Sequence, residues 1–97
     1  MNTSICDAIK RHLVLEFVYK GLSRTVEPHC HGTTRANNEV LRAFQIGGES
    51  ESGRAIGWKL FDVDQISGLV ASSEVFTGTR PGYNPSDSHM TSICCAV

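Results

Sequence analysis

The chain lacks a long apolar run, since no 18 consecutive apolar residues occur among its 97 residues. A transmembrane helix needs about that many, and the first residues also lack the basic region and apolar stretch of a secretory signal. Neither sign of charge dominates, because nine Lys and Arg residues stand against ten Asp and Glu residues and give a formal net charge of −1. This balance excludes a general nucleic-acid coat, so any anion site must be local. We expect a cytoplasmic protein without membrane contact.

Cysteines are few and irregularly spaced, at Cys6, Cys30, Cys94 and Cys95. A disulfide framework normally shows more regular spacing, and a reducing cytosol keeps thiols free. A bridge between the neighbours Cys94 and Cys95 would also distort the usual separation of bridged Cα atoms. We therefore predict four thiols that act as small, buried or half-buried apolar residues.

Catalytic and metal-binding motifs are absent as well. The chain has neither Gly-x-Ser-x-Gly nor a glycine motif that cradles phosphate, so we predict no enzyme and no cofactor. His29 and His31 share one face of an extended strand while Cys30 points away, which offers a metal two ligands at most. A third ligand, such as His89, would have to come from elsewhere. We predict no metal site.

The chain does contain apolar residues that alternate as in strands. Between residues 13 and 19, every second residue from Leu13 to Tyr19 falls on one face of an extended strand, and this face is the expected core side. The stretches 23–31, 40–46, 58–63 and 69–76 also have the composition of strands, whereas residues 4–12 have helical spacing. Five short antiparallel strands would expose two edges if the sheet were flat, so closure into a small barrel is favoured.

The predicted architecture is therefore mainly β, in a single domain that spans residues 1–97. A helix at 4–12 precedes a five-stranded barrel at 13–76, and an irregular tail at 77–97 packs back on the barrel as a helical turn or a short strand. Pro28 cannot donate a ladder hydrogen bond and should mark an edge or a bulge. Residues 47–57 form a loop rich in Gly and Ser, which we expect to be mobile at 49–54. The expected core comprises Leu15, Phe17, Val26, Leu41, Phe61, Ile66 and Leu69.

Several polar side chains interrupt these apolar strands and are candidates for ligand contacts. An arginine fork can hold phosphate oxygens, and a tyrosine can stack on a base or donate a hydrogen bond to it. The alternative is ordinary surface pairing, for example of Arg24 with Glu16 or Glu27. We predict that Tyr19, Arg24, His29 and Arg42 line one shallow site for an anionic, nucleotide-like ligand. The complete set of predicted ligand-binding residues is Tyr19, Arg24, His29, Arg42, Gln45 and Lys59.

The order of several motifs resembles the WYL domain, a bacterial module. The resemblance covers roughly residues 5–75 and depends on Tyr19, Arg24, Glu27-Pro28-His29, Asn38-Glu39-Val40-Leu41-Arg42-Ala43 and Phe61-Asp62-Val63-Asp64-Gln65-Ile66. It implies an SH3-like or Sm-like barrel that senses a ligand in transcription regulation or phage defence. The implied ligand is a nucleotide or a single-stranded nucleic-acid fragment, and the implied partner is a protein that carries a DNA-binding domain, often within a dimer.

An alternative reading is a protein-interaction or oligomerisation module without a small ligand, whose exposed strand edges recruit another chain or a second copy. About a dozen residues precede the first strand, too few for a helix-turn-helix domain. We therefore expect any regulatory output to pass through a partner.

Overall fold

The protein is mainly β with one helix at its N-terminus, and the computed structural model describes residues 3–50 and 53–97. Among these residues no helix is long and apolar enough to cross a membrane. The elements are α1 (Thr3–Arg11), β1 (Leu13–Tyr19), β2 (Leu22–Thr33), β3 (Glu39–Gly48), β4 (Gly57–Asp62), the 3-10 helix η1 (Val63–Gln65), β5 (Ile66–Val75) and β6 (Ser92–Ala96).

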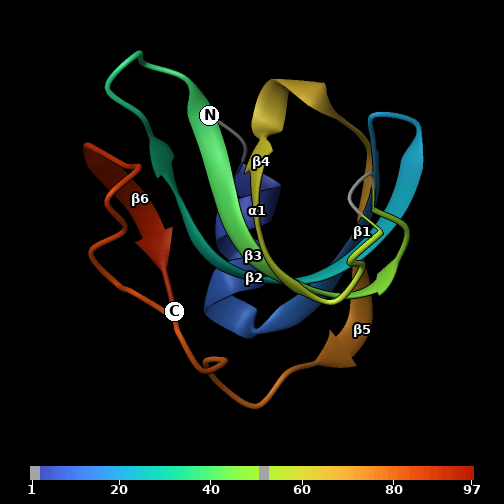
Figure 1. Cartoon of the computed structure of the whole chain (residues 1–97). Coiled ribbons are helices and arrows are strands. Elements are labelled where there is room, and N and C mark those ends of the chain that lie inside the picture. The colour runs from blue at the N-terminus through green and yellow to red at the C-terminus, as the bar shows by residue number, and fades with distance from the viewer. Residues whose placement is uncertain (1–2, 51–52) are drawn as a thin grey trace.

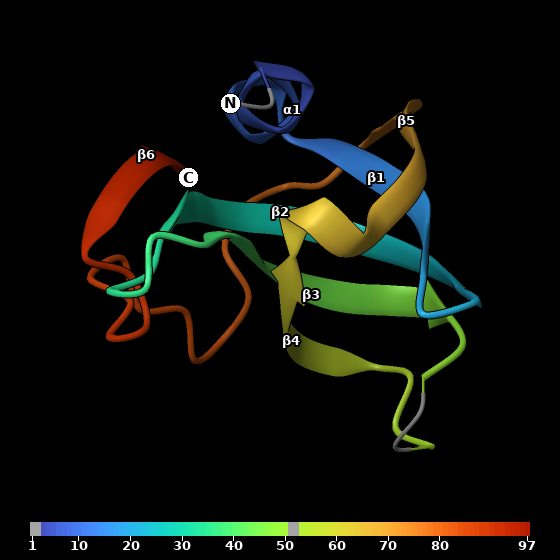
Figure 2. The same ribbon diagram turned by 90° about the horizontal axis from the view of Figure 1, so that it is seen from above.

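The strands form one antiparallel sheet in the order β4-β3-β2-β1-β5. The sheet bends strongly, and Figure 2 shows α1 beside β1 and β2, with β3 and β4 on the side away from the helix. No pairing between β4 and β5 closes the sheet within residues 3–50 and 53–97. The predicted antiparallel sheet is confirmed, and the predicted barrel closure is not.

The C-terminal tail contains a sixth strand, so the prediction of five strands needs correction, and of the two forms expected for the tail it is the short strand that is present. β6 pairs with residues 30–33 of β2, beyond the point where β1 leaves β2, and lies next to α1 (Figures 1 and 2). Gly32 permits this approach, because a Cβ there would lie 2.2 Å from the carbonyl oxygen of Ser92. The predicted return of the tail onto the sheet is confirmed.

A bulge interrupts the ladder between β2 and β3 next to Pro28. Pro28 lies opposite Ala43, but Cys30 lies opposite Arg42, so His29 is the extra residue. A bulge is one way for a strand to include a proline, and it changes the direction of the neighbouring side chains. The prediction for Pro28 is confirmed.

The core lies between α1 and the inner face of the sheet. Ile5, Ala8 and Ile9 of the amphipathic helix are fully buried against strand residues of alternate positions. Of the predicted core residues, Ile66 and Leu69 are only partly buried and pack at its margin. The other five, Leu15, Phe17, Val26, Leu41 and Phe61, are buried.

A disulfide joins Cys6 of α1 to Cys95 of β6, which makes the prediction of four thiols wrong. The two residues are 89 positions apart in the sequence, yet their Cα atoms are 5.5 Å apart, within the range that a disulfide spans. This proximity arises because α1 and β6 both pack beside β2. Cys30, which is buried, and Cys94, which is half-buried, remain thiols as predicted.

Side chains of the sheet hold both ends of the loop between β3 and β4. The amide of Gln45 donates hydrogen bonds to the carbonyl oxygens of Gly47 and Glu49, at 3.0 and 2.9 Å. Nζ of Lys59 donates to Oγ of Ser50 and to the carbonyl oxygen of Arg54. Residues 51 and 52 lie outside the described residues, so the mobility of residues 49–54 stays a prediction.

Candidate functional site

The six predicted ligand-binding residues fall on two faces of the sheet instead of in one site. Lys59 lies opposite the core residue Ala43 and therefore on the inner face, whereas Arg42 and its partner Leu60 lie on the outer face. Tyr19, Arg24 and Gln45 accompany Lys59 on the inner face, and His29 accompanies Arg42 on the outer face. The structure thus separates the four residues expected to line a single shallow site.

A pocket on the inner face is lined by Tyr19, Arg24 and Lys59, together with Lys20, Ser50, Leu60 and Phe61. Gln45 is fully buried behind them and does not line it. The buried guanidinium of Arg24 lies over the rings of Tyr19 and Phe61, 5.5 and 5.7 Å from their centroids. It donates to the carbonyl oxygen of Tyr19 and to Oε1 of Gln45, and the hydroxyl of Tyr19 accepts a hydrogen bond from the N–H of Asp62. These contacts join the β1–β2 hairpin to β3 and to the end of β4, so the role of this group is structural.

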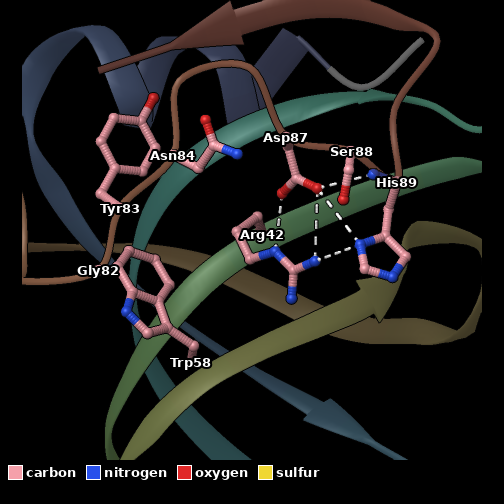
Figure 3. A pocket seen from close by; sticks show the side chains of 8 residues that line it. All are labelled: Arg42, Trp58, Gly82, Tyr83, Asn84, Asp87, Ser88 and His89. Carbon is pink, nitrogen blue, oxygen red and sulfur yellow. Dashed lines mark hydrogen bonds and ion pairs between the residues drawn. The ribbon is translucent and has the colours of Figure 1, made fainter.

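The outer face has a second pocket, of about 270 Å³, between β3, β4 and the segment that leads to β6. Figure 3 shows the rings of Trp58 and Tyr83 on one side and a polar network of Arg42, Asp87 and His89 on the other. We call it the Arg42–Trp58 pocket. Its lining residues are Arg42, Trp58, Gly82, Tyr83, Asn84, Asp87, Ser88 and His89.

Asp87 fixes the guanidinium of Arg42 in the Arg42–Trp58 pocket. Nε and Nη2 of Arg42 donate to the two carboxylate oxygens at 2.8 and 3.4 Å, and Nη2 also donates to Nδ1 of His89 at 2.9 Å (Figure 3). Burial alone would raise the pKa of Asp87, but hydrogen bonds from Arg42 and from the N–H of His89 outweigh it, so this pKa is lowered. The carboxylate is therefore ionised at neutral pH and holds Arg42 in one orientation.

The aromatic wall of the Arg42–Trp58 pocket is backed by His29. Trp58 and Tyr83 are nearly parallel, with centroids 6.1 Å apart, and the indole N–H donates to the carbonyl oxygen of Pro81. The ring of His29 contacts both and also stacks on Phe76, at 5.5 Å between centroids. His29 is fully buried, so it supports the wall and offers no surface to a ligand.

Both ring nitrogens of His29 are occupied within the protein. Nε2 accepts from the N–H of Arg80 at 3.2 Å, so Nδ1 carries the proton and donates to the carbonyl oxygen of Glu27 at 2.8 Å. Burial lowers the pKa of His29, although the contacts with Glu27 oppose this effect. The imidazole is therefore neutral at neutral pH and offers a ligand no positive charge.

The melting temperature is expected to fall between about pH 7.5 and pH 5.5 because of His29. An unfolded histidine takes up a proton near its ordinary pKa of about 6.5, but the folded chain resists because the pKa of His29 is lowered. The stability that the neutral ring contributes is complete above about pH 6.5 and is lost as the pH falls below it. Differential scanning calorimetry should show a smaller fall for His29→Phe, which keeps an aromatic ring but cannot be protonated. Equal falls in both proteins would contradict this assignment.

The Arg42–Trp58 pocket presents hydrogen-bond donors beside its aromatic wall. No described residue accepts a hydrogen bond from Nη1 of Arg42. The Oδ1 atom of Asn84 accepts from the N–H of Ser86, which leaves its amide NH₂ as a donor. Since Nδ1 of His89 accepts from Arg42, its Nε2 carries the proton of the neutral ring. This arrangement suits a planar ligand that carries several acceptors.

Sequence reasoning identified Arg42 but missed most of the Arg42–Trp58 pocket. Asp87 and His89 lie in the segment 77–97, where no strand or helix pattern indicates which way a side chain points. The one available signal for Trp58 was its position two residues before Leu60, on the outer face of the same strand. The residues that sequence reasoning did not assign to a ligand site are Trp58, Gly82, Tyr83, Asn84, Asp87, Ser88 and His89.

The two histidines considered as metal ligands point to different surroundings, since the bulge at His29 separates them. The ring of His31 contacts α1 and β3, whereas that of His29 contacts the aromatic wall. Within residues 3–50 and 53–97, no group of three His, Cys, Asp or Glu residues could hold a metal ion.

In comparisons with known proteins, no family model, curated protein or solved structure matches the chain.

Proposed function

We propose that this domain is a binding module for a nucleotide or a single-stranded nucleic-acid fragment, with the base in the Arg42–Trp58 pocket. The observation that carries the proposal is the position of the half-buried Trp58 ring beside the guanidinium of Arg42. Asp87 fixes this guanidinium, and its Nη1 has no acceptor among the described residues. Stacking on an aromatic ring holds any base, and a guanidinium fork binds base carbonyls or phosphate oxygens. The module binds its ligand without chemical conversion.

The charge of the Arg42–Trp58 pocket favours a ligand with one or two acceptor groups over a polyphosphate. Asp87 neutralises most of the field of Arg42, and its carboxylate would repel a second phosphate. We therefore place the base, with its carbonyl oxygens and ring nitrogens, against Arg42 and Asn84. The resemblance to WYL domains supports the same ligand class, an Sm-like or SH3-like relationship for the open sheet, and an output through a partner in transcription regulation or phage defence.

The intrinsic fluorescence of the single tryptophan is expected to fall when mononucleotides or short single-stranded oligonucleotides bind. Trp58→Leu should weaken binding about 5- to 150-fold, which corresponds to about 1–3 kcal/mol for one stacked base; calorimetric titration measures this loss. Arg42→Lys keeps the ion pair with Asp87 but loses the planar fork, so it should also weaken binding. The matched control is Arg35→Lys at an exposed position.

If Arg42→Lys binds the ligand as tightly as wild type does, the ligand does not bind in the Arg42–Trp58 pocket. The absence of both quenching and heat with every nucleotide at millimolar concentration would reject the binding proposal. For a ligand that binds Arg42→Lys and wild type equally, Lys59→Ala tests the inner-face group. A ligand held by Tyr19, Arg24, Gln45 and Lys59 should bind Arg42→Lys but not Lys59→Ala.

A second candidate function is self-association through β5. This strand is at the end of the sheet, pairs with β1 alone among the described strands, and exposes Val70 and Val75, at 60% and 61% of their surface. An edge of this kind can pair with the same strand of a second copy. Sedimentation analysis without ligand distinguishes the two functions, since an oligomerisation module should form a concentration-dependent dimer and a ligand sensor should gain thermal stability only with its ligand.

A further inference from the structure

The disulfide between Cys6 and Cys95 contacts a histidine that is held by a glutamate. Nδ1 of His31 lies 3.5 Å from Sγ of Cys6, and Nε2 of the same ring contacts Oε2 of Glu39. His31 is fully buried, whereas Glu39 keeps 23% of its side chain exposed. None of these four residues lines the Arg42–Trp58 pocket, so the cluster is independent of the proposed ligand site.

The sheet places this cluster by register. His31 lies between Cys95 of β6 on one side and Leu41 of β3 on the other, and Glu39 is two residues before Leu41, on the same face of β3. After the bulge at His29, the side chain of His31 faces α1, where Cys6 lies. Four elements, α1, β2, β3 and β6, therefore each contribute one residue to the cluster.

Solvent reaches the cluster from the helix side. Cys6 is half-buried and lines a surface hollow together with Ser4, Asp7 and Lys10, through which a small reactant can approach it. Cys95 is half-buried as well, but it packs against the core and does not line the hollow. The hollow and the contact with His31 assign the attacking role to Cys6 and the resolving role to Cys95.

We propose that Cys6, Cys95 and His31 form a thiol–disulfide exchange centre whose co-reactant is an external thiol. When Glu39 accepts the Nε2–H of His31, Nδ1 is free to take the proton of a Cys6 thiol. The resulting imidazolium stabilises the thiolate, which is the reactive form of cysteine. Glu39 acts through His31 and is a positioning residue.

Reduction proceeds in two displacements. An external thiolate attacks Sγ of Cys6, which forms a mixed disulfide and releases Cys95 as a thiolate that takes up a proton. A second external thiolate attacks the outer sulfur of the mixed disulfide and releases Cys6 as the thiolate beside His31. Two external thiols become one external disulfide, and the two electrons reduce the Cys6–Cys95 bond. Oxidation follows the same steps in reverse, with Cys6 as the nucleophile.

The other two cysteines lack this environment. Burial raises the pKa of Cys30 to about 11, so its thiol is protonated and unreactive at neutral pH. Cys94 is half-buried beside Cys95, and no described histidine contacts its sulfur. Cys94 therefore serves as a reference thiol in the same molecule.

The test is the alkylation rate of the reduced chain with iodoacetamide between about pH 5.5 and pH 9, resolved by cysteine through peptide mass spectrometry. At about pH 6.5, Cys6 should react at least about tenfold faster than Cys94, and His31→Gln should abolish this advantage. Glu39→Gln should move the pH profile of Cys6 towards higher pH, whereas its matched control, Glu74→Gln on exposed β5, should not. The other charged groups at the hollow, Asp7 and Lys10, are the same in all variants.

Three results would overturn the proposal. The first is equal reaction rates for Cys6 and Cys94 in the folded, reduced chain, and the second is an unchanged rate for Cys6 in His31→Gln. The third is loss of the circular dichroism spectrum of the fold when dithiothreitol reduces the wild type, because an exchange centre must remain folded in both redox states. Titration of the oxidised protein with dithiothreitol gives a second readout, in which His31→Gln should need several times more reductant for half-reduction.

Discussion

Replacement of Cys95 by serine is expected to lower the free energy of unfolding by about 4 to 5 kcal/mol. The disulfide joins residues 89 positions apart, and cross-linking so long a loop removes much of the conformational entropy of the unfolded chain. The bridge also holds β6 against α1. Without it, β6 is held by its hydrogen bonds to β2. Urea denaturation of Cys95→Ser and wild type, extrapolated to water with the slope fitted for each protein, measures the loss.

Cys94→Ser is the matched control, because it makes the same change at the neighbouring half-buried residue without opening a disulfide. Its loss should stay within about 0.5 kcal/mol. A loss below about 1 kcal/mol in Cys95→Ser would mean that the bridge is absent in solution or that the unfolded chain is already compact. Small domains have total stabilities of about 5–15 kcal/mol, so the variant should still fold when the wild type exceeds the lower end of this range.

The helix and the first five strands could be predicted in order and type because they depend on local pattern. Alternation at residues 13–19 reproduces β1, and the proline in β2 coincides with a bulge. These features follow from side-chain period and from the missing N–H of proline, which the sequence states directly.

The disulfide and the pairing of β6 with β2 could not be predicted because both depend on contacts between distant segments. Spacing gives no sign that Cys6 and Cys95 meet, since their proximity follows from the packing of α1 and β6 against β2. Pairing of β6 with β2 also needs the β1–β2 ladder to end at Val26 and Gly32 to admit a close backbone. Each condition belongs to the tertiary structure.

The candidate site was predicted only in part for a similar reason. Polar residues on strands could be recognised as candidates, but not their faces relative to one another, because one bulge reverses the alternation beyond it. His29 shows the consequence, since it is the extra residue of the bulge and its ring is enclosed by aromatic residues of the tail. Asp87 lies 45 positions from Arg42, so its role becomes visible only when the tail is folded.

Replacement of Leu41 by alanine is expected to lower the free energy of unfolding by about 2 to 5 kcal/mol. Leu41 is fully buried at the centre of the inner face, on a strand paired on both sides, so the surrounding side chains cannot close the cavity that truncation leaves. Leu69→Ala removes the same atoms at a partly buried position of β5 and should cost less than half as much. Urea denaturation of both variants measures the two losses. Equal losses would show that β5 is as deeply packed as β3, and a loss below about 0.5 kcal/mol at Leu41 would place that side chain in water.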